Sequence, residues 1–243
     1  MEHELGLTAL FNDHLAGLGN AILSAVGMIA EHPARPWENW IVMEILVVAI
    51  LVALVLVLRA SLSAENPGKI QHLAEALYGF LLHQAHEVGI EHPEKYVNYF
   101  GTVFIFILFM NLIGAIPAFE SPTISVVVPA GLAACTFLYY NGMGFGAKGI
   151  GYLKHFMGPV WWMAPLLIPI EIISHLARPL SLTVRLYGNM FGGEQVTGAF
   201  LNLVHLLIPV IFMGLHVFVG LLQAYVFTLL TMIYVSMATG HDH

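Results

Sequence analysis

A row of polar side chains recurs within one long apolar stretch of this sequence. From Pro159 to about Asn202 the residues are mostly apolar, but charged, imidazole and amide groups return at steps of three or four. These groups are Glu171, His175, Arg178, Arg185 and Asn189, with Leu182 filling the one gap and Glu194 following downstream. Residues three and four apart share one face of an α-helix, so the spacing predicts a helix with a polar stripe.

Such a stripe is costly in a membrane, where a charge at the bilayer centre costs from about 2.5 to more than 10 kcal/mol. Its side chains are therefore expected to face a partner, water or an ion path. Carboxylates and histidines relay protons, whereas the guanidinium of Arg185 stays charged and repels them. We interpret the stripe as an ion path divided by Arg185. Glu194 and His216 belong to one part, and Glu171 and His175 belong to the other.

A structural role is the alternative, in which these charges only hold a pair of helices together. The last apolar span carries His216 and Gln223, seven residues apart and therefore on one face, so it is expected to pack against the stripe. Arg185, however, has no carboxylate three or four residues away on its own helix. Its partner must come from elsewhere, another chain included, which favours the functional interpretation.

Composition restricts the class of protein. The chain has 243 residues, of which 58% are hydrophobic and only 9% charged, and its mean hydropathy is +0.82. Soluble domains average about 25% charged residues, so we expect an all-α polytopic membrane protein. A net charge of -7 gives no basic surface for nucleic acid. Cys135 is the only cysteine, which excludes an intramolecular disulfide framework and a cysteine-rich metal site.

Five membrane-spanning helices are expected in a single domain over residues 37–243, preceded by an N-terminal arm at residues 1–36. The expected spans are 40–58, 99–117, 123–140, 160–202 and 209–237. Residues 65–87 have the pattern of an amphipathic interfacial helix, residues 141–158 that of a glycine-rich loop, and residues 5–29 that of either a short interfacial helix or a loose arm. The fourth span is about twice as long as the bilayer core is thick, so it either bends at a proline or lies steeply tilted.

Basic residues indicate the orientation. Arg59, Lys69, Lys95, Lys148 and Lys154 fall in segments that five crossings place on one side, whereas Arg35 falls on the other. The positive-inside rule therefore predicts an external N-terminus and a cytoplasmic C-terminus.

Rival functions lack their motifs. The sequence contains no metalloprotease His-Glu-x-x-His, no Gly-x-Ser-x-Gly nucleophile and no phosphate-binding Gly-x-x-x-x-Gly-Lys-Ser/Thr. A membrane metalloenzyme would have to combine His83, His86 and His92 with His175, which lies on a different, membrane-embedded segment. No cofactor and no metal are expected. A standalone secondary transporter or proton channel stays open, although no internal repeat is evident.

The sequence resembles subunit a of the rotary F-type ATP synthases, of the bacterial type. The resemblance rests on PLSLTVRLYGNMFGGE at residues 179–194 and LQAYVFTLLTMIY at residues 222–234. NLIGAIP at residues 111–117, followed by Ser121-Pro-Thr123, adds a weaker match, and the likeness covers the chain from about residue 37.

The resemblance implies roles for individual residues. Arg185 matches the arginine that faces a carboxylate of the c-subunit ring, and Gln223 matches the glutamine beside it. Glu194 and His216 match the outer half-channel, and Glu171 matches the cytoplasmic-side path. Arg178 stands where many relatives have lysine, and Ser181 and Asn189 match polar positions on the same helix, which would lie strongly tilted against the ring.

The implied protein is a stator subunit of the rotary motor in a bacterial plasma (inner) membrane, with no catalytic activity of its own. Its partners would be the c-subunit ring, the b-subunit stalk, the rest of the complex and the lipid bilayer. The expected ion is a proton, with sodium as the alternative. A proton from outside would neutralise a ring carboxylate near Glu194 and His216, and leave toward Glu171 after the ring has turned to Arg185.

Overall fold

The computed structural model describes residues 5–25, 32–63, 67–116, 119–151, 164–203 and 207–240, and all regular structure within these ranges is helical. The α-helices are α1 (Gly6–Ala25), α2 (Asn39–Ser61), α3 (Lys69–Glu87), α4 (Val97–Ile113), α5 (Val127–Lys148), α7 (Ala164–Leu203) and α8 (Leu207–Thr239). Short 3-10 helices are η1 (Pro93–Lys95), η2 (Pro122–Ile124) and η3 (Gly149–Gly151). Asn39–Ser61, Pro165–Phe200 and Val210–Thr239 are long and apolar enough to cross a membrane, and Val97–Ile113 is a shorter apolar helix. The described chain is therefore all-α, as predicted, and has the composition of a polytopic membrane protein.

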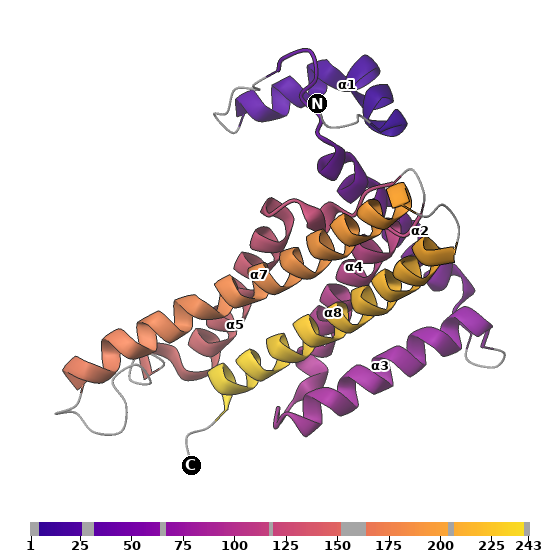
Figure 1. Cartoon of the computed structure of the whole chain (residues 1–243). Coiled ribbons are helices and arrows are strands. Elements are labelled where there is room, and N and C mark those ends of the chain that lie inside the picture. Colours follow the sequence, from indigo (N-terminus) through magenta and orange to yellow (C-terminus); the bar gives the residue numbers. More distant parts are fainter. Residues whose placement is uncertain are drawn as a thin grey trace.

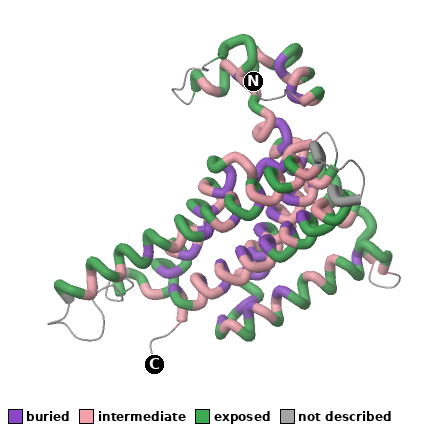
Figure 2. Tube along the Cα trace, viewed as in Figure 1, coloured by how far each residue is buried: buried purple, intermediate pink, exposed green. Residues whose placement is uncertain are grey.

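Helix α8 is the centre of the bundle. It runs beside α7 along most of its length and also packs against α4 and α5 (Figure 1). The core between these helices and α2 contains fully buried side chains such as Met43, Ile107, Met190 and Phe227. Burial is concentrated on the inward faces, while the outward faces are exposed (Figure 2). Many exposed residues on α2, α7 and α8 are large and apolar, as expected where lipid or another membrane subunit covers them.

Helix α7 settles one of the alternatives left by the sequence. It is continuous over 40 residues, about 60 Å, and does not divide into two helices. Pro165 is the second residue of the helix, where a backbone N–H has no intrahelical partner. Pro169 and Pro179 lie inside the helix and each removes one backbone donor without ending it.

The prediction of a loop at residues 141–158 is wrong for residues 141–148, which are helical. Helix α5 continues to Lys148, and Asn141 donates a hydrogen bond from Nδ2 to the carbonyl of Phe137, 2.7 Å away. The helix ends at Gly149, whose φ of +57° is readily available only to glycine. The glycines that suggested a loop are tolerated because a helix in lipid must satisfy its backbone hydrogen bonds internally. Residues 152–163, with Lys154, lie outside the described residues.

The expected span at residues 123–140 is also displaced. Residues 122–124 form η2, and α5 begins at Val127, because Pro122 begins a 3-10 turn. The preceding span, expected at 99–117, is α4 at 97–113, and Pro117 lies outside the described residues. Tyr99, near the start of α4, donates a hydrogen bond to Thr136 and stacks on Tyr139, both in the middle of α5.

The N-terminal segment forms a helix over the described part of residues 5–25. Asn12 of α1 donates to the carbonyl of Trp37 and accepts from its backbone N–H, and the Trp37 indole donates to the carbonyl of Leu15. These bonds join α1 to the start of α2. The amphipathic α3 is confirmed as a helix at 69–87, beside α4.

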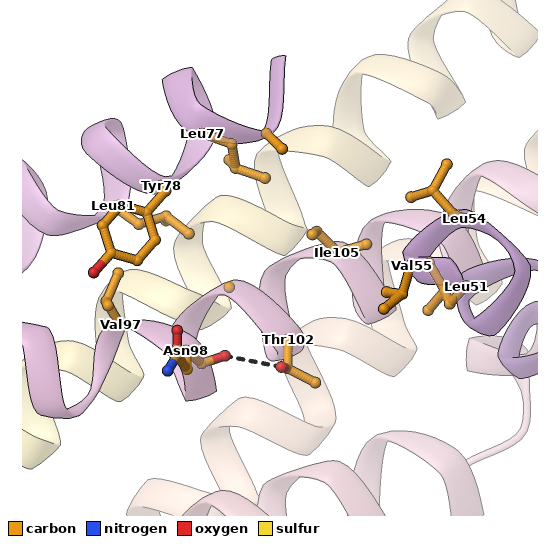
Figure 3. A pocket seen from close by; sticks show the side chains of 12 residues that line it. Leu51, Leu54, Val55, Leu77, Tyr78, Leu81, Val97, Asn98, Thr102 and Ile105 are labelled. Carbon is orange, nitrogen blue, oxygen red and sulfur yellow. Dashed lines mark hydrogen bonds between the residues drawn. The ribbon is translucent and has the colours of Figure 1, made fainter. Parts of the chain in front are cut away.

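A groove of about 290 Å³ lies between α2, α3 and α4 (Figure 3). Its walls are mainly apolar, with Leu51 and Leu54 from α2, Leu77 from α3 and Ile105 from α4. The hydroxyl of Thr102 donates to the backbone carbonyl of Asn98, so it adds no free donor. The groove has no side-chain cluster suited to ion transfer.

Buried hydrogen bonds of Asn111 join α4 to α8 and to η2, and we expect their removal to destabilise the bundle. Asn111 is 1% exposed, donates from Nδ2 to the carbonyl of Gly220 at 3.0 Å, and accepts from Thr123 Oγ1 at 2.9 Å. Replacing Asn111 with alanine should lower the free energy of unfolding by about 1–3 kcal/mol. Thermal dissociation of the purified complex measures this loss. Asn98→Ala, at an exposed asparagine of the same helix, is the matched control, and an equal midpoint for both variants would contradict the prediction.

Candidate functional site

The antiparallel pair of α7 and α8 carries every side chain that the sequence singled out for ion transfer. Helix α7 supplies Glu171, His175, Arg178, Ser181, Arg185, Asn189 and Glu194, and α8 supplies His216 and Gln223. Leu182, Leu186 and Met190, spaced four residues apart, are fully buried against the bundle and fix the rotation of α7. This rotation divides the stripe, since His175 is buried with the apolar row while Ser181 and Asn189 are exposed beside it.

A hydrogen bond joins the two helices at the middle of the pair. Asn189 donates from Nδ2 to Oε1 of Gln223 at 2.8 Å, and Gln223 is 3% exposed. The Nε2 group of Gln223 is buried and has no partner among the described residues. Arg185, one turn before Asn189, is partly buried, and within the described ranges no hydrogen bond or ion pair involves its guanidinium. The Arg185 guanidinium and the Nε2 group of Gln223 are therefore both donors without an acceptor among the described residues.

Glu194 and His216 form the site toward the α1 end of the bundle. His216 is 8% exposed, and its Nε2 has no partner within the described chain. The same holds for the buried Oε2 of Glu194. The two helices approach closely because Gly193 has no side chain. A Cβ atom there would lie 2.9 Å from Nδ1 of His216, so only glycine leaves the imidazole in place.

Two cavities adjoin this pair. One, of about 380 Å³, is lined by Glu194 together with Glu38, Asn39 and Glu120. The other, of about 310 Å³, lies between α7 and α8 and is lined by His216 with Asn189 and several glycines. A carboxylate and an imidazole that line neighbouring cavities large enough for water are suited to transferring protons.

The opposite end of α7 is held by ionic and aromatic contacts. Arg178 lies 4.0 Å from Glu171, and its guanidinium carbon is 5.2 Å from the ring centre of Tyr234 on α8. His175 makes a 2.9 Å hydrogen bond through Nε2 with Oδ1 of Asn141 on α5. The structure therefore brings Glu171 to Arg178 and directs the imidazole Nε2 of His175 to α5.

Several partners at the site were not identified from the sequence. Glu120 lies in the connection between α4 and α5, Asn141 lies on α5, and Tyr234 lies on α8. A signal existed for Glu120, a carboxylate in a short turn between two apolar spans. Asn141 and Tyr234 gave none, because their partners are 34 and 56 residues away in the sequence. Among the residues that the structure describes, no three His, Cys, Asp or Glu side chains come together as metal ligands.

Comparison with known proteins shows the family of this chain. Residues 41–236 match the family described as ATP synthase A chain. The chain is 57% identical to ATP synthase subunit a of Solibacter usitatus over 235 residues, which cover 96% of this chain and all of the relative. It is 49% identical to subunit a of Koribacter versatilis over the full length of both chains, and 44% identical to subunit a 1 of Syntrophotalea carbinolica over 82% and 84% of the two chains. The chain therefore belongs to the ATP synthase A chain family.

Proposed function

We propose that this chain is the proton-conducting, non-catalytic stator subunit of a rotary ATP synthase, with two aqueous half-channels separated by Arg185. One observation carries the proposal: the Arg185 guanidinium has no partner in the described chain, although proton-relay groups flank it along α7. Glu194 lies about 14 Å from it along the helix axis, and Glu171 lies about 21 Å away in the other direction. A permanent cation in this place blocks direct proton transfer between the two groups.

The missing partner of Arg185 is a carboxylate of the c-subunit ring. The neighbouring surface of α7 supports this assignment, because Leu180, Val184 and Phe191 are large, apolar and exposed beside the polar Ser181. An apolar surface with one cation is complementary to ring helices that each carry a single carboxylate in the membrane. Gly188 and Gly192, against whose Cβ positions nothing lies within 4 Å, allow those helices to approach closely.

During synthesis a proton enters through the cavity at Glu194, passes to His216 and neutralises a ring carboxylate. The neutral carboxylic acid turns into the lipid, where an ionised carboxylate would be far more costly. After almost a full turn the acid reaches Arg185, which stabilises the carboxylate and so favours loss of the proton. The proton leaves along the Glu171 side, and ATP is made elsewhere in the complex.

The proposed topology has five crossings, formed by α2, α4, α5, α7 and α8. The positive-inside rule places the N-terminus outside the bacterial plasma membrane and the C-terminus in the cytoplasm. Since α7 is about 60 Å long, it must lie steeply tilted to remain within a core about 30 Å thick. The outward faces of the remaining spans are available to lipid and to the b-subunit stalk.

Labelling of cysteines from either side of the membrane tests this arrangement. In a Cys135→Ser background, Ser125→Cys lines the cavity at Glu194 and should react with a membrane-impermeant thiol reagent added from outside. Glu171→Cys should react with the same reagent added from the cytoplasmic side.

Val57→Cys, on the exposed apolar face of α2, is the control that should react with the reagent from neither side. Labelling of both test cysteines from a single side of sealed vesicles would disprove the two half-channels.

A further inference from the structure

The cavity beside Glu194 contains two more carboxylates whose role the proton path does not yet explain. Glu38 precedes α2, and Glu120 lies in the connection between α4 and α5. Both line the cavity of about 380 Å³ together with Glu194, and none of the described residues that line it is a lysine, arginine or histidine. The walls therefore bear one sign of charge only. These elements come together at the end of the bundle where the structure places α1.

Glu120 is held in position rather than free in solution. Asn39, the first residue of α2, donates from Nδ2 to Oε2 of Glu120 at 3.1 Å. The backbone N–H of Leu5 in turn donates to Oδ1 of Asn39 at 3.2 Å, which fixes the orientation of the amide. Next to Asn39 in the chain, Glu38 accepts a hydrogen bond at Oε2 from the indole N–H of Trp40. Both carboxylates thus accept from neutral donors, and no cationic side chain among the described residues forms an ion pair with either of them.

A metal site is a poor explanation for this set of carboxylates. Within the described residues the three carboxylates do not come close enough to act together as ligands for one ion. Neither the buried Oε2 of Glu194 nor the Nε2 of His216, which is 8% exposed, has a hydrogen-bond partner among the residues that the structure describes. Glu194 itself lines the cavity, and the adjacent Gly193 packs against the ring of His216, which lines the neighbouring cavity between α7 and α8. The cavity therefore leads toward groups that accept a proton.

We propose that Glu120, assisted by Glu38, makes this cavity an electrostatic funnel that concentrates protons at the entrance of the outer half-channel and transfers them to Glu194. A cleft with low-dielectric walls and charges of one sign focuses the field, raises the local concentration of the opposite ion and accelerates its capture. The funnel rests on the proposed function, because it supplies protons to the path through Glu194 and His216. Glu120 thus raises the proton concentration beside Glu194, and Glu194 is the group that accepts the proton and passes it on.

The proposal predicts a displacement of the pH profile rather than a loss of maximal rate. Removing one charge from the cavity should lower the local proton concentration about fivefold at low ionic strength. A tenfold change in proton concentration is one pH unit, so a fivefold change is about 0.7 unit. The curve of ATP synthesis rate against external pH should therefore lie about 0.7 unit lower in pH for Glu120→Gln than for the wild type. The maximal rate at acidic pH should equal that of the wild type. Raising the salt to about 1 M should remove most of the shift, because the Debye length falls to about 3 Å.

The experiment uses the whole ATP synthase in liposomes. The lumen of the liposome corresponds to the outside of the cell, and its pH and salt concentration are set by incubation in an acid bath. Asp13→Asn is the matched control, because it removes one negative charge from the exposed part of α1 without touching the cavity. Glu194→Gln is measured in the same assay and should lose synthesis at every pH.

Coincident pH profiles for Glu120→Gln and the wild type at low salt would overturn the funnel, provided that Glu194→Gln is inactive. A lower maximal rate without displacement would also overturn it, since that is the result of a purely structural role. Full activity of Glu194→Gln would instead refute the proton path through Glu194 on which the funnel rests. A pH profile that is displaced for Glu120→Gln but not for Asp13→Asn, with an unchanged maximal rate, supports the funnel.

Discussion

Replacing Arg185 with alanine should abolish ATP-driven proton pumping and increase the passive proton leak. Arg185 is the permanent cation between Glu194 and Glu171, and it has no hydrogen-bond or ion-pair partner in the described chain. Without it, a ring carboxylate loses the charge that favours deprotonation, and water in the two half-channels is no longer separated by a cation. We expect pumping to fall at least 100-fold, because one proton-transfer step depends on a full charge in low dielectric. Acridine-dye quenching in sealed vesicles measures pumping and leak.

The control for this experiment is Arg59→Ala, which removes an exposed arginine at the end of α2. It should pump normally, which shows that loss of a basic residue alone has no effect. Assembly is checked from the amount of complex recovered from the membranes. Near-normal pumping by assembled Arg185→Ala would refute the coupling role and leave the polar stripe with the function of holding α7 to its neighbours.

Replacing Glu194 with glutamine should reduce pumping and synthesis at least tenfold while the c-ring and Arg185 remain intact. The amide has nearly the shape of the carboxyl group but neither gains nor loses a proton at physiological pH, so it interrupts the relay to His216. Passive proton conduction through the membrane sector, after removal of the catalytic sector, should fall by the same factor, because the blocked step lies on the common path.

The neighbouring Gln195 offers a close control. It lines the same cavity, is exposed and cannot titrate. Gln195→Ala should therefore conduct protons at close to the wild-type rate. If both variants lost conduction equally, the shape of the cavity rather than the carboxyl group of Glu194 would be responsible. If neither variant lost conduction, protons would enter by another route.

Local sequence patterns predicted which segments are helical more accurately than they predicted where each helix ends. The apolar run of α2 and the amphipathic repeat of α3 appear in the structure within a few residues of their predicted limits. The end of α5 was missed by eight residues, from Tyr140 to Lys148, because glycine and asparagine are typical of loops in water. In this helix Asn141 bonds to the preceding turn and, through His175, to α7, contacts that a single-helix pattern does not contain.

The sequence alone predicted the class of protein and the stripe on α7, because both depend on composition and on residues three or four apart. It also predicted that Arg185 would find no partner on its own helix. Only the tertiary structure decided what lies beside each group. It places Gly193 against His216, gathers Glu38, Glu120 and Glu194 around one cavity, and sets Tyr234 against Arg178. These residues come from helices and connections distant in the chain, and the packing of the buried apolar rows determines which of them meet.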